Sequence, residues 1–71
     1  MLTLSEVQIA RFGLELATIR QHHSDLDAAI QALKSSKQDD PMVISRLKKH
    51  KLLAKDRIVE LEKLLIPDIL A

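Results

Sequence analysis

Cysteine is absent from this chain of 71 residues, and glycine, proline and aromatic residues are scarce. Without cysteine there can be no disulfide, and the commonest zinc sites are excluded. One glycine, two prolines and a single aromatic residue are typical of a helical protein rather than of strands and turns. No run of about 18 apolar residues occurs, so no segment is expected to cross a membrane.

Charge is also nearly balanced, with 11 Lys and Arg against 10 Asp and Glu and a net charge of +1. This balance gives the chain no overall attraction to nucleic acid or to other polyanions. The first residues include Glu6 and have no basic start before an apolar block, so they do not resemble a secretory signal. A cytoplasmic location is therefore the expectation.

Two stretches carry apolar residues at alternating spacings of three and four, the pattern of a helix that is apolar on one side. The first stripe consists of Ile9, Phe12, Leu16, Ile19, His23, Leu26, Ile30 and Leu33. The second consists of Ile44, Leu47, Lys51, Ala54, Ile58, Leu61 and Leu65. When the second stripe is folded back on the first, one register matches seven layers, from Leu33 against Ile44 to Phe12 against Leu65. We predict an all-α fold, an antiparallel two-helix hairpin that resembles a coiled coil.

Capping signals place the helix boundaries. The segment from Thr3 to Glu6 fits a capping box, which would start the first helix. Asp40 suits the N-cap of the second helix and Pro41 its first position, while Pro67 would end it. The predicted elements are a helix at about residues 4–36, a turn at 37–40, a helix at about 41–66 and a short tail at 67–71, all within one domain of residues 1–71.

The first helix is expected to be longer than the second, about 50 Å against about 39 Å at 1.5 Å per residue. Residues 2–10 would then extend beyond the second helix, and this overhang carries Leu4 and Val7. Either the tail, through Ile69 and Leu70, or another chain would have to cover it.

The second helix carries a further stripe outside the seam, formed by Leu52, Val59 and Ile66 at intervals of seven, with Leu53 beside it in the sequence. A contiguous exposed apolar surface normally marks an interface. Small chains without disulfides or metals often depend on oligomerisation for stability. We expect a homo-oligomer, a dimer or a tetramer, and the alternative is a flexible monomer. The interface candidates are Leu4, Val7, Leu52, Val59 and Ile66.

Two polar residues interrupt the stripes at positions that face the seam. His23 lies opposite Ala54, the smallest residue of the second stripe, and Lys51 lies opposite Leu26. Isolated polar residues at such positions fix register and oligomeric state at some expense of stability, and we interpret both in this way. A pH-dependent switch through His23 is the sharper alternative.

Catalytic or metal-binding constellations are not apparent. His22 and His23 lie beside Asp25 and Asp27, but adjacent helical residues point in different directions and cannot chelate one metal as residues four apart can. No serine or cysteine is paired with a base for nucleophilic catalysis. We expect no enzyme activity, no cofactor and no metal. Asp27 is expected instead to form an ion pair with Lys48 across the hairpin.

The second helix opens with a basic run that only Asp56 opposes. The run comprises Arg46, Lys48, Lys49, Lys51, Lys55 and Arg57. Such a run can contact phosphates, so the alternative function is an anion-binding module, for nucleic acid or an acidic surface. No aromatic residue is interleaved to stack bases and no helix-turn-helix spacing is visible, which argues against nucleic acid. A membrane surface bound by the apolar face of the first helix is a weaker alternative. The anion-binding candidates are Arg46, Lys48, Lys49, Lys55 and Arg57.

Residues 23–30, 39–40 and 47–58 resemble the YdcH-like family, short bacterial proteins built around a domain of unknown function. The family pattern is a His, then Leu and Ile at helical spacing, an acidic turn, and a Leu-Lys-x-x-Lys-Leu-x-Leu-Lys-Asp-Glu-Ile run. The residues that match this run are Leu47, Lys48, Lys51, Leu52, Lys55, Asp56 and Ile58. Ala54 departs from the pattern where the family often has Leu, and Arg57 where it has Glu.

The resemblance covers about residues 15–62. It implies an α-helical hairpin in a bacterial, cytoplasmic protein, and it implies no established activity. The sequence as a whole predicts a non-enzymatic interaction or scaffold module that associates with itself and could also bind another protein.

Overall fold

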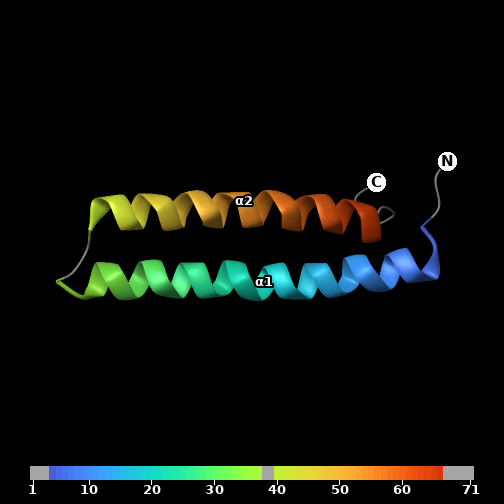
Figure 1. Cartoon of the computed structure of the whole chain (residues 1–71), viewed down its shortest axis with the longest axis horizontal. Coiled ribbons are helices and arrows are strands. Elements are labelled where there is room, and N and C mark those ends of the chain that lie inside the picture. Colours follow the sequence, from blue (N-terminus) through green and yellow to red (C-terminus); the bar gives the residue numbers. More distant parts are fainter. Residues whose placement is uncertain (1–3, 38–39, 67–71) are drawn as a thin grey trace.

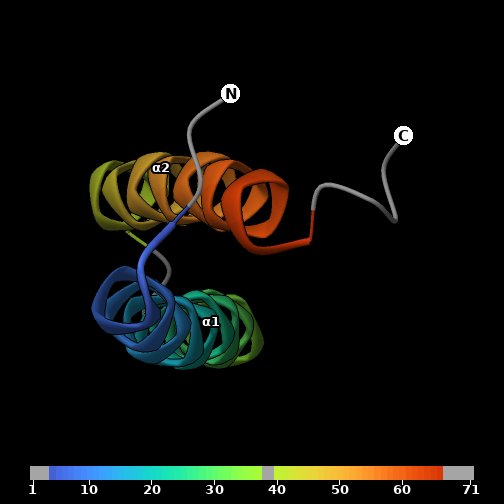
Figure 2. The same cartoon turned by 90° about the vertical axis from the view of Figure 1, so that its right-hand side faces the viewer.

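The computed structural model of the chain describes residues 4–37 and 40–66, which form two helices lying side by side (Figure 1). Helix α1 spans Glu6–Ser35 and helix α2 spans Pro41–Leu65. Figure 2 shows the same two helices after a quarter turn, stacked one on the other. The body measures 51 × 21 × 17 Å, so it is one pair of helices in cross-section. The predicted all-α hairpin is confirmed.

Helix α1 begins later than predicted because Ser5, rather than Thr3, caps it. The backbone N–H of Gln8 donates to Ser5 Oγ at 3.2 Å, and the N–H of Ser5 donates to Gln8 Oε1 at 2.9 Å. These reciprocal bonds form a capping box on Ser5 to Gln8. The prediction that Thr3 caps the helix was therefore wrong, and Thr3 itself lies outside the described residues.

Helix α2 begins as predicted. Asp40 is the N-cap, its Oδ1 accepting from the backbone N–H of Met42 at 2.9 Å, and Pro41 occupies the first helical position. At the other end the N–H of Ile66 donates to the carbonyl of Glu62 at 2.8 Å and closes the last turn. Pro67, predicted to end this helix, lies outside the described residues.

The predicted seam forms the contact between α1 and α2. All residues of the seven predicted layers, from Phe12 to Leu33 and from Ile44 to Leu65, are buried or half-buried. The best-packed cluster joins three adjacent layers of the predicted register. It consists of Leu16, Ile58 and Leu61, with Phe12, Ile19 and Leu65 packed against it.

The predicted overhang is present at the start of α1, which runs past the end of α2 (Figure 1). Ile9, which belongs to the predicted overhang, is 49% exposed because α2 ends before it reaches this level. Val7 is 61% exposed and Leu4 is half-buried. The predicted covering of this segment by Ile69 and Leu70 falls outside the described residues.

Candidate functional site

Ion pairs between the helices distinguish two flanks of the hairpin. Lys51 and Arg57 lie three residues before and after the buried Ala54, so at 3.6 residues per turn they point to opposite sides of it. We call the side of Lys51, which includes Lys48, Leu52 and Lys55, the lysine flank. The side of Arg57, which includes Leu53 and Glu60, is the arginine flank.

The arginine flank is closed by a paired guanidinium. Arg57 Nε and Nη2 donate to the two carboxylate oxygens of Glu15 at 2.6 and 2.9 Å, and Nη1 donates to Glu60. The hydrogen bond from Arg57 holds the pKa of the Glu15 carboxyl below its usual value, and partial desolvation opposes it. The same hydrogen bond raises the pKa of Arg57.

The lysine flank carries the second pair between the helices. Lys51 Nζ donates to Asp27 Oδ1 at 2.6 Å, and this hydrogen bond, followed by the lysine charge, lowers the pKa of Asp27. The predicted pairing of Asp27 with Lys48 was therefore wrong. Lys51 stands at the edge of the seam, and its flexible chain carries the ammonium group out to the nearest carboxylate. Arg20 Nη2 lies 3.9 Å from Glu62 Oε1, a third and looser pair between the helices.

The two predicted polar seam residues are both half-buried. Lys51 reaches out to Asp27, so its charge is not held inside the seam. His23 lies in the layer of Ala54, which is 3% exposed. Their role in setting the register stays a prediction, since packing alone does not measure the effect of replacing them.

The predicted interface residues occupy two separate places. Leu52, Val59 and Ile66 are 62%, 38% and 36% exposed and follow one another along the lysine flank, since residues seven apart return to nearly the same side of a helix. Val7 and Leu4 lie on the overhang of α1. Leu52 is 13 residues from the end of α2, about 20 Å at 1.5 Å per residue, so the two groups do not form one compact patch.

Other exposed apolar residues were missed by the sequence analysis. Leu14 is 71% exposed on α1, and Met42 and Leu64 are 72% and 42% exposed on α2. Leu14 follows Val7 by seven residues, a spacing that could have indicated it. Leu53, which is 56% exposed, precedes Arg57 by one helical turn and so points to the arginine flank, away from Leu52.

The basic run is divided between the sides of α2. Lys48 and Lys55 share the lysine flank, whereas Arg46 is eleven residues from Arg57 and therefore lies on the same side as it. Lys49 points outward, away from α1. Arg57 is taken up by its two glutamates. The other four predicted anion-binding residues make no ion pair within residues 4–37 and 40–66: Arg46, Lys48, Lys49 and Lys55.

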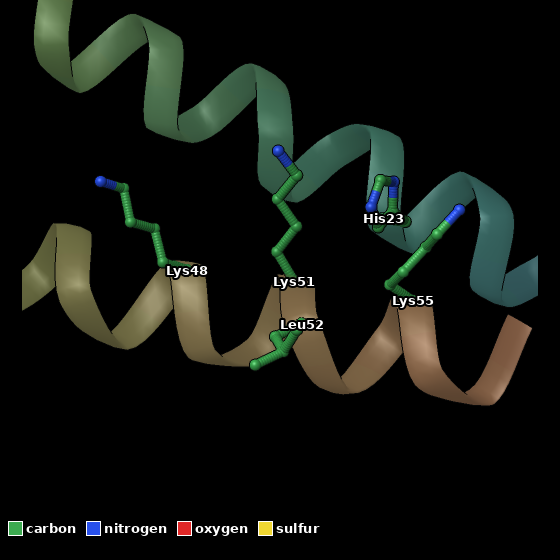
Figure 3. A pocket seen from close by; sticks show the side chains of 5 residues that line it. All are labelled: His23, Lys48, Lys51, Leu52 and Lys55. Carbon is green, nitrogen blue, oxygen red and sulfur yellow. The ribbon is translucent and has the colours of Figure 1, made fainter. Parts of the chain in front are cut away.

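A shallow depression of about 490 Å³ lies on the lysine flank (Figure 3). His23 reaches into it from α1, and the other lining residues come from α2: Lys48, Lys51, Leu52 and Lys55. In Figure 3 Lys51 and Lys55 extend towards α1 on either side of His23. The depression therefore combines up to four nitrogen donors with one exposed leucine.

The part of the chain that the structure describes contains neither a membrane-spanning helix nor a cluster of metal ligands. Neither helix is long and apolar enough to cross a bilayer. No three His, Asp or Glu side chains in residues 4–37 and 40–66 come together as metal ligands.

Residues 16–62 match a family model described as "Protein of unknown function (DUF465)". The chain belongs to this family. YdcH-like short proteins are members of it, so the resemblance seen in the sequence is confirmed. The DUF465 segment contains most of both helices and the whole lining of the depression, whereas the overhang and Ile66 lie outside it. No curated protein and no solved structure matches the chain.

Proposed function

We propose that this DUF465 protein is a non-enzymatic interaction module that associates with itself as a dimer or tetramer. The contact surface is the apolar stripe of the lysine flank, formed by Leu52, Val59 and Ile66, together with Leu4 and Val7 of the overhang. The observation that carries the proposal is that the Leu52 side chain is 62% exposed on an otherwise well-formed helix.

A pair of helices cannot enclose its apolar residues on all sides. Among the described residues six apolar side chains are buried, and of these only Leu61 has no exposed surface. Ten large apolar residues in the same ranges are 36–72% exposed. A core of this size gives little net stability, so association would stabilise the fold as well as bury the stripe.

The free energy gained by burying the apolar stripe can be compared with the cost of association. The exposed parts of Leu52, Val59 and Ile66 amount to a little more than one whole apolar side chain, or about 2–4 kcal/mol per copy when buried. Two copies would gain about 4–8 kcal/mol, against an association cost of about 4–15 kcal/mol. The stripe alone gives a weak dimer, and Val7, which is 61% exposed, supplies the further area that a stable one requires.

Light scattering coupled to gel filtration tests this proposal over a range of concentrations. The expected mass is two or four times the 8.0 kDa of one chain. A constant mass of 8.0 kDa up to tens of micromolar would overturn it.

A second candidate function is anion binding by the basic run. It is supported by the four exposed cations that lack an ion pair in the described part of the chain, and weakened by the pairing of Arg57. Gel-shift titration with nucleic acid at two salt concentrations tests it, because binding to phosphates must weaken steeply as salt rises. No shift at low salt would remove nucleic acid as a partner. The cytoplasmic location stays a prediction.

A further inference from the structure

We propose that the depression on the lysine flank binds a compact anion that carries a diphosphate group, with the organic part of the ligand lying over Leu52. Its lining comes from one chain, but it shares Leu52 with the proposed contact between copies, so this ligand and a second copy would compete for that surface. The site also differs from a nucleic-acid track, because it uses a few cations gathered at one place.

The arrangement of the lysines indicates an anionic ligand. Lys48, Lys51 and Lys55 are neighbours on one side of α2, at spacings of three and four. Like charges at such spacings repel each other and destabilise a helix. Asp27 compensates Lys51, but neither Lys48 nor Lys55 has an ion-pair partner among the described residues. Two uncompensated ammonium groups therefore flank a third, and a bound anion would remove their repulsion.

The other charged groups nearby do not supply this compensation. Glu62, about two turns beyond the depression along α2, is paired with Arg20. Asp56 follows Lys55 in the sequence, but at 3.6 residues per turn it points about 100° away, towards the outer side of α2. The positive charge of the depression is thus left for a molecule from outside.

Size and position favour a compact ligand over a long polyanion. Lys48 and Lys55 are seven residues apart, about 10 Å along the axis, and flexible lysine chains can converge on one diphosphate over that length. Along α2 the cations do not continue as one stripe, because Arg46 lies on the other flank and Arg57 is held by Glu15.

His23 and Leu52 distinguish the site from a group of surface lysines. His23 extends from α1 between Lys51 and Lys55, so the second helix contributes a donor (Figure 3). Leu52 lines the outer side of the depression, its side chain pointing away from α1 (Figure 3), and it is 62% exposed. An apolar surface beside phosphate-binding groups suits a ligand with a ring or a hydrocarbon part, and ADP is a suitable probe for it.

The three histidines provide an internal control for an NMR titration. His23 lines the depression, whereas His22 lines a separate hollow with Gln21 and Asp25, and His50 is exposed elsewhere on α2. Pyrophosphate is added at constant ionic strength, with sulfate as the matched control. We expect saturable shifts of the His23 ring and of neighbouring residues, with little change at His22 and His50. Equal, unsaturable shifts of all three histidines would overturn the proposal.

Substitutions that keep the helix test the role of the lysines. The double variant Lys48→Gln with Lys55→Gln should weaken pyrophosphate binding at least tenfold, because it removes both uncompensated charges. Lys49→Gln removes one charge from the same helix outside the depression, and it should change the affinity less than twofold. Equal losses in the two variants would show that only the net charge matters and would contradict a site. Circular dichroism verifies that all variants stay helical.

ADP tests the organic part of the ligand. We expect ADP to bind at least threefold more tightly than pyrophosphate and to shift the Leu52 methyl signals, which pyrophosphate alone should move less. Unchanged Leu52 signals would contradict the assignment. The variant Leu52→Gln separates this proposal from self-association: it should leave pyrophosphate affinity within twofold while weakening the oligomer. Loss of pyrophosphate affinity in this variant would contradict the assignment of the phosphate group to the lysines.

Discussion

The substitution Leu52→Gln gives the sharpest test of how the hairpin pairs. Glutamine is a good helix former without charge, so the variant keeps the helix and the electrostatics of the lysine flank. It removes a leucine that is 62% exposed in the single chain. Burying that fraction is worth about 1–2 kcal/mol per copy.

In a symmetric dimer the change is made in both copies, so the loss is about 2–4 kcal/mol. The dissociation constant should therefore rise about 30-fold to about 700-fold, since 1.4 kcal/mol is a factor of ten. Sedimentation velocity over a concentration series measures the constant for the parent and the variant. Circular dichroism establishes that the helical content is unchanged.

The neighbouring leucine provides a matched control. Leu53 is 56% exposed, receives the same substitution in Leu53→Gln, and points to the arginine flank. We expect the dimer dissociation constant of the Leu53→Gln variant to differ from that of the parent by less than threefold. Equal weakening by both substitutions would refute the assignment of the interface to the lysine flank, and weakening by Leu53→Gln alone would place the interface on the other side.

Three further predictions concern the hairpin itself, each measured by unfolding at one fixed protein concentration. Ala54→Leu should place too large a side chain in its layer and destabilise the chain by about 1–3 kcal/mol. The loss should be smaller in a His23→Ala background, where the layer has more room. Additive effects of the two substitutions would show that the two residues do not share a layer. Gly13→Ala should stabilise the fold by about 1 kcal/mol, because a Cβ there meets nothing within 4 Å and alanine is the better helix former. A loss of stability would reveal a contact at this position. The hydrogen bond from Arg57 lowers the pKa of Glu15 from its ordinary value of 4.5, so the contribution of this pair to stability is present above pH 4.5 and is lost as the pH falls through the lowered value. Glu15→Gln should flatten the pH dependence of the unfolding free energy in that range. An unchanged profile would contradict the pairing.

The seam was predictable because burial between two helices requires apolar residues at spacings of three and four, and this pattern is visible in the sequence. Each apolar position from Phe12 to Leu33 returns to the same side of α1, and only one register matches it to α2. The polar exceptions, His23 and Lys51, were predicted to face the seam, and both are half-buried there. The exposure of Ile9 also follows, because the predicted register ends the seam at Phe12 and leaves residues 2–10 beyond the second helix.

Local choices between near-equal alternatives were not predictable. Thr3 and Ser5 each begin a capping pattern, and the sequence does not indicate which hydroxyl the backbone meets. Asp27 has two lysines within reach, and the choice of Lys51 depends on where flexible side chains extend. The depression is a property of both helices together, so it could not be read from the basic run alone.

Isotope-filtered nuclear Overhauser spectroscopy on a mixture of labelled and unlabelled chains tests the central claim of pairing most directly. It detects methyl contacts between copies and nothing within a copy. We predict intermolecular signals from the Leu52, Val59 and Ile66 methyl groups. Intermolecular signals confined to Leu53 and Leu64, or none at hundreds of micromolar, would contradict the account.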